Sequence, residues 1–258
     1  MVESAKVTNT NSQNASGSTM IEVDRLKMAY GSFIAVDSIS FTLKAGEVLA
    51  LLGPNGAGKS TTMKMLTCFL PPTAGTARIC GNDIRTEPEK VKSSIGFMPE
   101  NAPLYADMNV YEFLHFIARM RSIPERNIKE AIHKVVELCH LQQVVYRSID
   151  HLSKGYRARV SMAQALIHDP PVLIFDEPTD GLDPNQKDEV RNLVRRLAPN
   201  KCIILSTHIL EEVGPVCSRA IIIAKGKIRF DGGPQDLISQ AKDGQLNAVF
   251  RKLTHGVE

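Results

Sequence analysis

The feature that most constrains the fold is a glycine-rich loop between two segments of different pattern. Residues 48–52, VLALL, are continuously apolar, as strands buried on both faces of a parallel sheet are. GPNGAGKS follows at residues 53–60 and fits the pattern GxxxxGK[ST]. Residues 60–70 then show a helical pattern that stops at two prolines. A strand, a glycine loop and a helix in this order predict a phosphate-binding loop in an α/β fold.

Each residue type in this loop suits a polyphosphate ligand. Gly53, Gly56 and Gly58 let backbone N–H groups turn inward, and the helix that follows adds the positive end of its dipole. We expect Lys59 to reach the β and γ phosphates and the Ser60 hydroxyl to ligate Mg²⁺. The alternative is a plain glycine turn, which the flanking strand and helix make the weaker interpretation.

Length and composition bound the rest of the chain. With 258 residues it can form one large domain with an inserted subdomain and a full core. The 31 basic and 28 acidic residues give a formal charge of +3, which neither requires nor excludes a phosphate-bearing partner. Five cysteines without a CxxC pair indicate reduced side chains, as in a cytosolic protein. No apolar run approaches the roughly 18 residues of a membrane span.

The N-terminal quarter of the chain contains two patterns. Residues 1–19 are rich in Ser, Thr and Asn, and we expect a disordered tail there. Residues 21–30 and 33–43 alternate apolar and polar side chains, which predicts two half-buried strands. These strands are expected to form an antiparallel sheet at the edge of the domain.

Strands and helices alternate in the second half of the chain. The apolar segments 172–176 and 202–208 flank a helical segment at 185–197, which predicts a parallel α/β sheet. Residues 110–120 and 128–141 are amphipathic and precede this part of the sheet. They predict a helical insertion.

Four acidic residues lie at or beyond the end of the apolar segment in the stretch VLIFDEPTDGLDP. Ligands bind at the carboxyl ends of parallel strands, so we expect this strand end beside the phosphate loop. Asp176 is then placed to hold Mg²⁺, directly or through water, and Glu177 to orient and polarise an attacking water. Asp180 and Asp183 are equally well explained as caps of the following turn.

His208 ends the apolar segment 202–208 and is a candidate sensor of the γ phosphate because it too lies at a strand end. The other histidines have no such placement and are expected to be ordinary solvated or core side chains. They are His115, His133, His140, His151, His168 and His255.

A second candidate phosphate site lies in the basic stretch HLSKGYRARV, residues 151–160. Ser153 is a good N-cap, and apolar residues at helical spacing continue from Tyr156 until HDPP. Gly155 bares the first turn, so free N–H groups and the helix dipole can bind an anion. Aromatic residues are only 5% of the chain, which leaves few platforms for stacking nucleic-acid bases. A nucleotide phosphate is therefore favoured over nucleic acid.

Together these motifs resemble those of the ATP-binding subunits of ABC transporters. GPNGAGKS corresponds to Walker A, LSKGY stands where the family has LSGGQ, and VLIFDE corresponds to Walker B with its catalytic acid. DGLD matches the D-loop, STH carries the switch histidine, and Tyr30 in MAYGS matches the adenine-stacking aromatic. The order and spacing agree from residue 20 to about residue 234. PENAPLY and LSKGYRARV are similar to exporter ATPases of the multidrug and gliding-motility type.

The resemblance implies a P-loop NTPase with a mostly parallel core sheet, an antiparallel β edge subdomain and an inserted helical subdomain. It places the ATPase domain at residues 20–234, the helical subdomain at about 100–168, and a short helical extension at 235–258. It also implies a head-to-tail homodimer or heterodimer with two ATP molecules, each between Walker A of one subunit and the signature of the other. The residues implied to contact ATP are Tyr30, Gly53, Pro54, Asn55, Gly56, Ala57, Gly58, Lys59, Ser60 and Thr61, with Ser153 and Gly155 acting from the other subunit.

Two departures from the family pattern concern function. Lys154 and Tyr156 replace the first glycine and the glutamine of the signature, while Ser153 and Gly155 remain. Glu100 occupies the position of the Q-loop glutamine. It keeps an oxygen that can face Mg²⁺, so the implied metal ligands are Ser60, Asp176 and Glu100.

The resemblance further implies a membrane partner. The helical subdomain would receive a coupling helix from a separate permease, which places the ATPase at the inner face of the cell membrane. The likeness of PENAPLY and LSKGYRARV to exporter ATPases implies an exporter. A soluble ABC ATPase acting on nucleic acid or ribosomes is the main alternative, although such proteins usually carry long coiled coils or two ATPase halves. A nucleotide sensor without turnover is a third, against which Glu177 and His208 argue. We expect no nucleic-acid partner.

Overall fold

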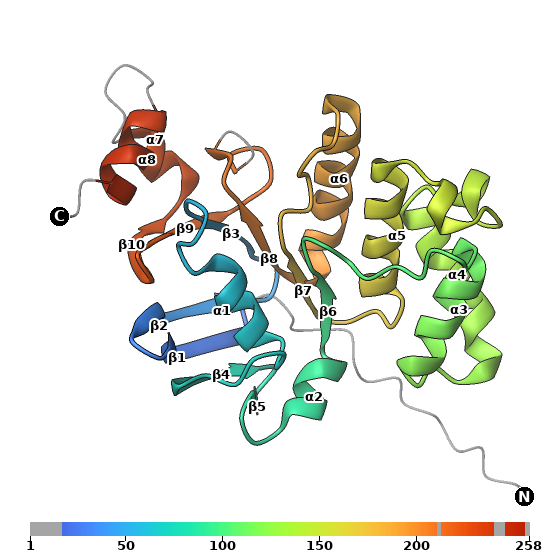
Figure 1. Ribbon diagram of the computed structural model, residues 1–258, viewed down its shortest axis with the longest axis horizontal. Coiled ribbons are helices and arrows are strands. Elements are labelled where there is room, and N and C mark those ends of the chain that lie inside the picture. The colour runs from blue at the N-terminus through green and yellow to red at the C-terminus, as the bar shows by residue number, and fades with distance from the viewer. Residues whose placement is uncertain (1–16, 211–212, 240–245, 256–258) are drawn as a thin grey trace, which may run out of the picture.

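Two β-sheets organise the part of the chain that the computed structural model describes, residues 17–210, 213–239 and 246–255 (Figure 1). Residues 1–16 of the predicted tail lie outside the described residues. The strands of the larger sheet, in spatial order, are β10 (Lys227–Gly232), β9 (Arg219–Ala224), β3 (Val48–Leu52), β8 (Cys202–Thr207), β7 (Val172–Phe175) and β6 (Ile95–Met98). Those of the smaller sheet are β2 (Phe33–Lys44), β1 (Thr19–Tyr30), β4 (Ala74–Ile79) and β5 (Asn82–Asp83).

The larger sheet is parallel except for β10, which pairs antiparallel with β9. Successive side chains of β3 face two different hydrophobic clusters: Val48 and Ala50 belong to one, and Leu49 and Leu51 to the other. Because both faces of this strand are covered, every one of its residues is apolar and buried. The predicted parallel core is confirmed.

The smaller sheet is antiparallel and covers one face of the larger sheet, together with α1 (Lys59–Leu66) and α2 (Pro88–Ser93). Ile21 and Leu43 from its strands share a hydrophobic cluster with Met63 of α1 and Leu51 of β3. The predicted antiparallel edge sheet is therefore confirmed.

Four helices pack in the hydrophobic cluster on the opposite face: α3 (Val110–Met120), α4 (Glu125–Leu138), α5 (Lys154–Leu166) and α6 (Pro184–Leu197). In Figure 1, α3 and α4 stand at the edge of the molecule farthest from β1 and β2. Asn109 caps α3 in a capping box with Glu112, which fixes its start at the predicted residue. Short 3₁₀ turns occupy Gln142–Val144, Ile149–His151 and Ala198–Asn200.

Two predicted helix boundaries are wrong for local reasons. α1 ends at Leu66 instead of residue 70, because Cys68 has a left-handed φ of 56°. α4 lies three residues earlier than the predicted 128–141. The first turn of the helix, directly after Pro124, is polar, so the apolar pattern does not reveal it. The helix ends early because His140, just beyond its end, takes a left-handed φ of 53°.

The C-terminal residues form α7 (Pro234–Ser239) and α8 (Leu246–His255), which lie beside β9 and β10 in Figure 1. Phe250 and Leu253 pack against the cluster that also holds α3 to α6. Among the described residues no helix has the length and apolar character needed to cross a bilayer.

His168 is half-buried after α5, where its Nε2 lies 3.1 Å from the carbonyl oxygen of Ile95. Burial, together with the nearby charge of Arg121, lowers the pKa of His168 from 6.5 to about 4. The unfolded chain therefore takes up this proton more readily, so the contribution to stability is complete above pH 6.5 and is lost as the pH falls toward 4.

We expect His168→Gln to remove that part of the pH dependence. In the parent protein, the free energy of unfolding should fall by about 1 to 2 kcal/mol between pH 6.5 and 4 because of this histidine. This value allows for solvent screening of a half-buried ring. Urea unfolding at several pH values measures the difference. If the free energy of unfolding changed equally with pH in parent and variant between pH 6.5 and 4, His168 would not be the group responsible.

Candidate nucleotide-binding site

The phosphate loop between β3 and α1 is wedged between β2 and β9. A Cβ added to Gly53 would overlap the carbonyl oxygen of Ile223 in β9, and one added to Gly58 would lie 2.5 Å from that of Ala35 in β2. Gly58 also has a φ of 110°, which side chains rarely tolerate. The loop therefore requires glycine at both positions, for space and for backbone conformation.

Lys59 is buried at the start of α1 and curls back over the loop. Its Nζ donates to the carbonyl oxygen of Gly53 at 2.7 Å and lies 3.7 Å from Oε1 of Glu177. The Lys59 ammonium group therefore places a positive charge beside the phosphate loop. The predicted phosphate-binding lysine and the predicted catalytic acid thus meet in one place.

Glu177 stands directly after β7 with a left-handed φ of 50°. A non-glycine residue in this conformation is strained, and such strain concentrates at functional sites. The second carboxylate oxygen, Oε2, lies 3.0 Å from Nδ1 of His208, and the backbone N–H donates to Ser206 Oγ at 2.8 Å. Lys59 and His208 therefore hold the carboxylate from two sides, and Ser206 holds the backbone of the same residue.

Asp176 is buried at the end of β7, where its Oδ1 accepts a hydrogen bond from Ser206 Oγ at 2.6 Å. β8 runs between β7 and β3 in the sheet, and the end of β7 still lies beside the phosphate loop, as expected, because Glu177 faces Lys59 there. Ser206 of β8 bridges Asp176 and the backbone of Glu177. Sequence reasoning missed this serine, whose only signal is its place two residues before His208.

Lys59, Glu177 and His208 face a pocket of about 500 Å³. It brings together most of the predicted ATP-contacting and catalytic residues with Glu100, a predicted metal ligand. The lining residues are Tyr30, Phe33, Ala35, Pro54, Asn55, Gly56, Ala57, Gly58, Lys59, Ser60, Thr61, Glu100, Glu177, Asp180 and His208.

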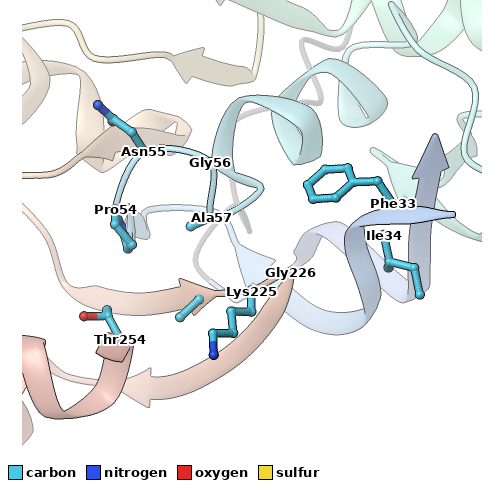
Figure 2. Close-up of a pocket in the computed structure, with 10 residues that line it drawn as sticks. Phe33, Ile34, Pro54, Asn55, Gly56, Ala57, Lys225, Gly226 and Thr254 are labelled. Carbon is cyan, nitrogen blue, oxygen red and sulfur yellow. The ribbon is translucent and has the colours of Figure 1, made fainter. Parts of the chain in front are cut away.

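Two exposed aromatic residues form one end of the pocket. Tyr30 ends β1 and Phe33 begins β2, and the two are cross-strand partners that are 50% and 62% exposed. Figure 2 shows Phe33 turned toward the phosphate loop and Ile34 turned away from it. Phe33 also borders a neighbouring cavity of about 520 Å³ that reaches Lys225 and Thr254. Phe33 was not predicted, although its position three residues after Tyr30 is a usable signal.

Ser153 and Gly155 are not among the residues that line this pocket. Ser153 caps α5, its Oγ accepting from the backbone N–H of Tyr156 at 3.4 Å, as predicted. Gly155 is buried, and a side chain there would overlap the amide of Gln186 at the start of α6. Asp183 caps α6, which confirms the simpler interpretation of that residue.

The parallel sheet, the glycine loop at the end of β3 and the carboxylate that faces its lysine define a P-loop nucleotide-binding protein. The family model described as ABC transporter matches residues 36–180. The chain belongs to the ABC transporter family, and its domain is an ATP-binding ATPase cassette.

Individual relatives agree with this family. The chain is 36% identical to the uncharacterized ABC transporter ATP-binding protein YxlF of Bacillus subtilis (strain 168), over 92% of this chain and 79% of that protein. It is 37% identical to the Nod factor export ATP-binding protein I of Paraburkholderia xenovorans (strain LB400), over 89% and 76% of the two chains.

Solved structures share the fold. The ATP-binding subunit of an ABC transporter has a TM-score of 0.82 at 28% identity, covering 91% of this chain and 99% of that one. A dimeric post-hydrolysis state of the cassette MJ0796 with ADP and Pi has a TM-score of 0.77 at 22% identity, covering 83% and 99%. At that identity the second likeness concerns the fold alone.

Proposed function

We propose that this chain hydrolyses ATP in a head-to-tail dimer and thereby drives export through a separate membrane permease. The observation that carries the proposal is the position of Glu177, whose two carboxylate oxygens face Lys59 and His208 in the pocket of the phosphate loop. A carboxylate placed in this way suits a general base better than a structural ion pair, because its backbone is strained as well.

In the proposed reaction, Glu177 takes a proton from a water molecule as the water oxygen attacks the γ phosphorus. The bond from that phosphorus to the bridging oxygen of ADP breaks, and ADP leaves with the electron pair. Lys59 and the backbone N–H groups of the loop stabilise the negative charge on the phosphates. His208, 3.0 Å from Glu177, orients this carboxylate and is placed to contact the γ phosphate.

Mg²⁺ fits the oxygen donors available here. Ser60 and Glu100 line the pocket, and Asp176 lies behind it at the end of β7. The described residues contain no cluster of three or more acidic, histidine or cysteine ligands. That agrees with Mg²⁺ held mainly by phosphate oxygens and water with one or two protein ligands, the arrangement usual for this ion. When bound, Mg²⁺ would neutralise phosphate charge.

The dimer is proposed because the second phosphate site lies apart from the first. Ser153 and Gly155 lie at the start of α5 and do not line the pocket of their own subunit. Ser153 is exposed, whereas Gly155 is buried against Gln186, so the prediction that Gly155 bares this turn is wrong. A second subunit, identical or related, would bring this turn to the γ phosphate of the first. The similarly folded cassette MJ0796 has itself been solved as a dimer.

The permease is proposed to dock in a groove of about 970 Å³ between the end of α1, α2, β6 and the end of α3. Phe69 and Met120 line it and are 76% and 68% exposed, large apolar side chains that a partner would cover. Docking there would hold the chain at the inner face of the cell membrane. The direction, export, is supported by the name of the Nod factor relative.

A pull-down in mild detergent, from cells that naturally make the protein, tests the proposal. We expect mass spectrometry to recover a multi-span membrane protein near one-to-one stoichiometry. Phe69→Glu and Met120→Glu should abolish its recovery, while Tyr146→Glu, an equally exposed aromatic outside the groove, should not. Recovery of only soluble or nucleic-acid partners would instead favour the soluble ABC ATPase, with the same ATPase chemistry.

We expect Tyr30→Leu to raise the KM for ATP about 5- to 100-fold with little change in kcat, because stacking on an aromatic ring binds the base and not the reacting phosphate. Phe33→Leu should have a smaller effect in the same direction. Tyr146→Leu is the matched control, because it makes the same change at an exposed tyrosine that lies outside the pocket. Steady-state hydrolysis over a range of ATP concentrations separates the two constants. An unchanged KM in Tyr30→Leu would exclude base stacking at this residue.

A further inference from the structure

Lys154 makes a contact that the family pattern does not contain. It occupies a glycine position of the signature, and its Nζ lies 3.4 Å from Oδ2 of Asp180 in the D-loop, residues 180–183. A side chain on Gly181 would collide with the Lys154 ammonium group, so the lysine lies directly over this glycine. The first turn of α5 and the D-loop are therefore joined within one subunit.

We propose that Lys154 is a positioning residue that ties the D-loop to the first turn of α5, so that both segments meet the partner's nucleotide as one surface. This inference rests on the head-to-tail dimer proposed above. Glycine at position 154 would supply no side chain for such a tie.

The D-loop also has restraints of its own, because Leu182 is buried in the core and Asp183 caps α6. Within it, the backbone N–H of Asp180 donates to the carbonyl oxygen of Glu177 at 3.1 Å, and that of Leu182 donates to Thr179 at 3.3 Å. Gly181 adopts a left-handed φ of 63° in the turn between them. The bond to Glu177 means that the position of Asp180 is coupled to the backbone of the proposed catalytic base.

A second contact joins the start of α5 to α6, the helix that follows the D-loop. Gly155 packs against the side-chain amide of Gln186 in α6, and Asp183 caps that helix. The start of α5 is thus fixed against α6 on one side, and Lys154 fixes the intervening D-loop on the other. Lys154 thus adds a direct contact between the signature turn and the D-loop.

The expected effect is modest. The side chains of Lys154 and Asp180 are 65% and 52% exposed, and such pairs are weak and screened by salt. A dimer contains two copies, so removing the charge should raise the dimer dissociation constant between about 2-fold and about 30-fold.

The test uses two measurements. In a Glu177→Gln background, ATP-driven dimerisation is followed by analytical ultracentrifugation for Lys154→Met, Asp180→Asn and the charge exchange Lys154→Asp with Asp180→Lys. We expect both single variants to weaken the dimer, the exchange to restore it at least in part, and the differences to vanish at 1 M NaCl. In the nucleotide-free monomer, hydrogen exchange of the amides of residues 180–182 should accelerate in Lys154→Met.

The outcomes distinguish a failure of the proposed Lys154 contact from a failure of the proposed dimer. If Glu177→Gln itself forms no dimer with ATP, the proposed dimer fails, and the exchange rates in the monomer still decide whether Lys154 orders the D-loop. Unchanged exchange in Lys154→Met would overturn the tie whatever the dimer does. A dimer weakened by Lys154→Met but not by Asp180→Asn would also overturn it, since the lysine would then act on the partner's phosphate directly.

Discussion

Replacing Glu177 with glutamine should lower ATP turnover at least about 100-fold while ATP binding is retained and an ATP-held dimer accumulates. Glutamine has nearly the same shape and keeps a hydrogen-bonding group toward His208, but it cannot accept the proton of the attacking water. The phosphate loop and Lys59 are unchanged, so the groups that hold the phosphates remain. Because hydrolysis is proposed to separate the subunits, its loss should trap them together.

Phosphate release and sedimentation with ATP measure both effects. Glu130→Gln in α4 is the matched control, because it makes the same chemical change at an exposed site away from the pocket. Turnover within a few fold of the parent protein would remove Glu177 as the base. Lost ATP binding would show that its charge serves the binding step instead.

Replacing Ser153 with arginine should reduce turnover by at least tenfold and prevent the ATP-driven dimer, while the monomer still binds ATP. A long cationic side chain at the first turn of α5 would fill the space that the partner's γ phosphate is proposed to occupy. The pocket of the same subunit does not include Ser153, so binding to a single chain should be preserved. Nucleotide binding and sedimentation, measured side by side, separate the two effects.

Ser153→Ala controls for the lost helix cap. It removes the hydrogen bond from the Tyr156 N–H without adding bulk, and should cost about 1 kcal/mol of stability with a much smaller loss of turnover. An unimpaired rate in Ser153→Arg would refute the assignment of this turn to the partner's nucleotide. A variant that fails to bind ATP at all would indicate misfolding, which the alanine variant and circular dichroism would identify.

Features that depend on a few consecutive residues can be predicted from the sequence. The apolar β3, the glycines of the loop and the start of α1 follow one another in the chain, so strand, phosphate loop and helix are predictable together. The cap of α5 by Ser153 and the cap of α6 by Asp183 are equally local. Predicting these features requires no information about residues far away in the sequence.

Contacts between distant segments were not predictable in the same way. Ser206 bridges Asp176 and Glu177 only because β8 inserts between β3 and β7, an order of strands that local patterns do not encode. The contact of Lys154 with Asp180 joins positions 26 residues apart. The left-handed backbone of Glu177 also has no sequence signal, because glutamate does not favour it.

The placement of β8 has a consequence for how the catalytic groups are spaced. Leu52 of β3 pairs with Thr207 of β8, and Phe175 of β7 pairs with Leu205 of β8. The pairing register of β8 therefore sets the relative positions of the phosphate loop after β3 and the acidic pair after β7. A slip of one residue would turn the Ser206 hydroxyl to the opposite face of the sheet and bring Leu205 or Thr207 to its place. The spacing of the acidic pair and the histidine is therefore kept by the hydrogen-bond ladder of the backbone, and apolar substitutions that preserve the ladder should change stability while leaving this spacing intact.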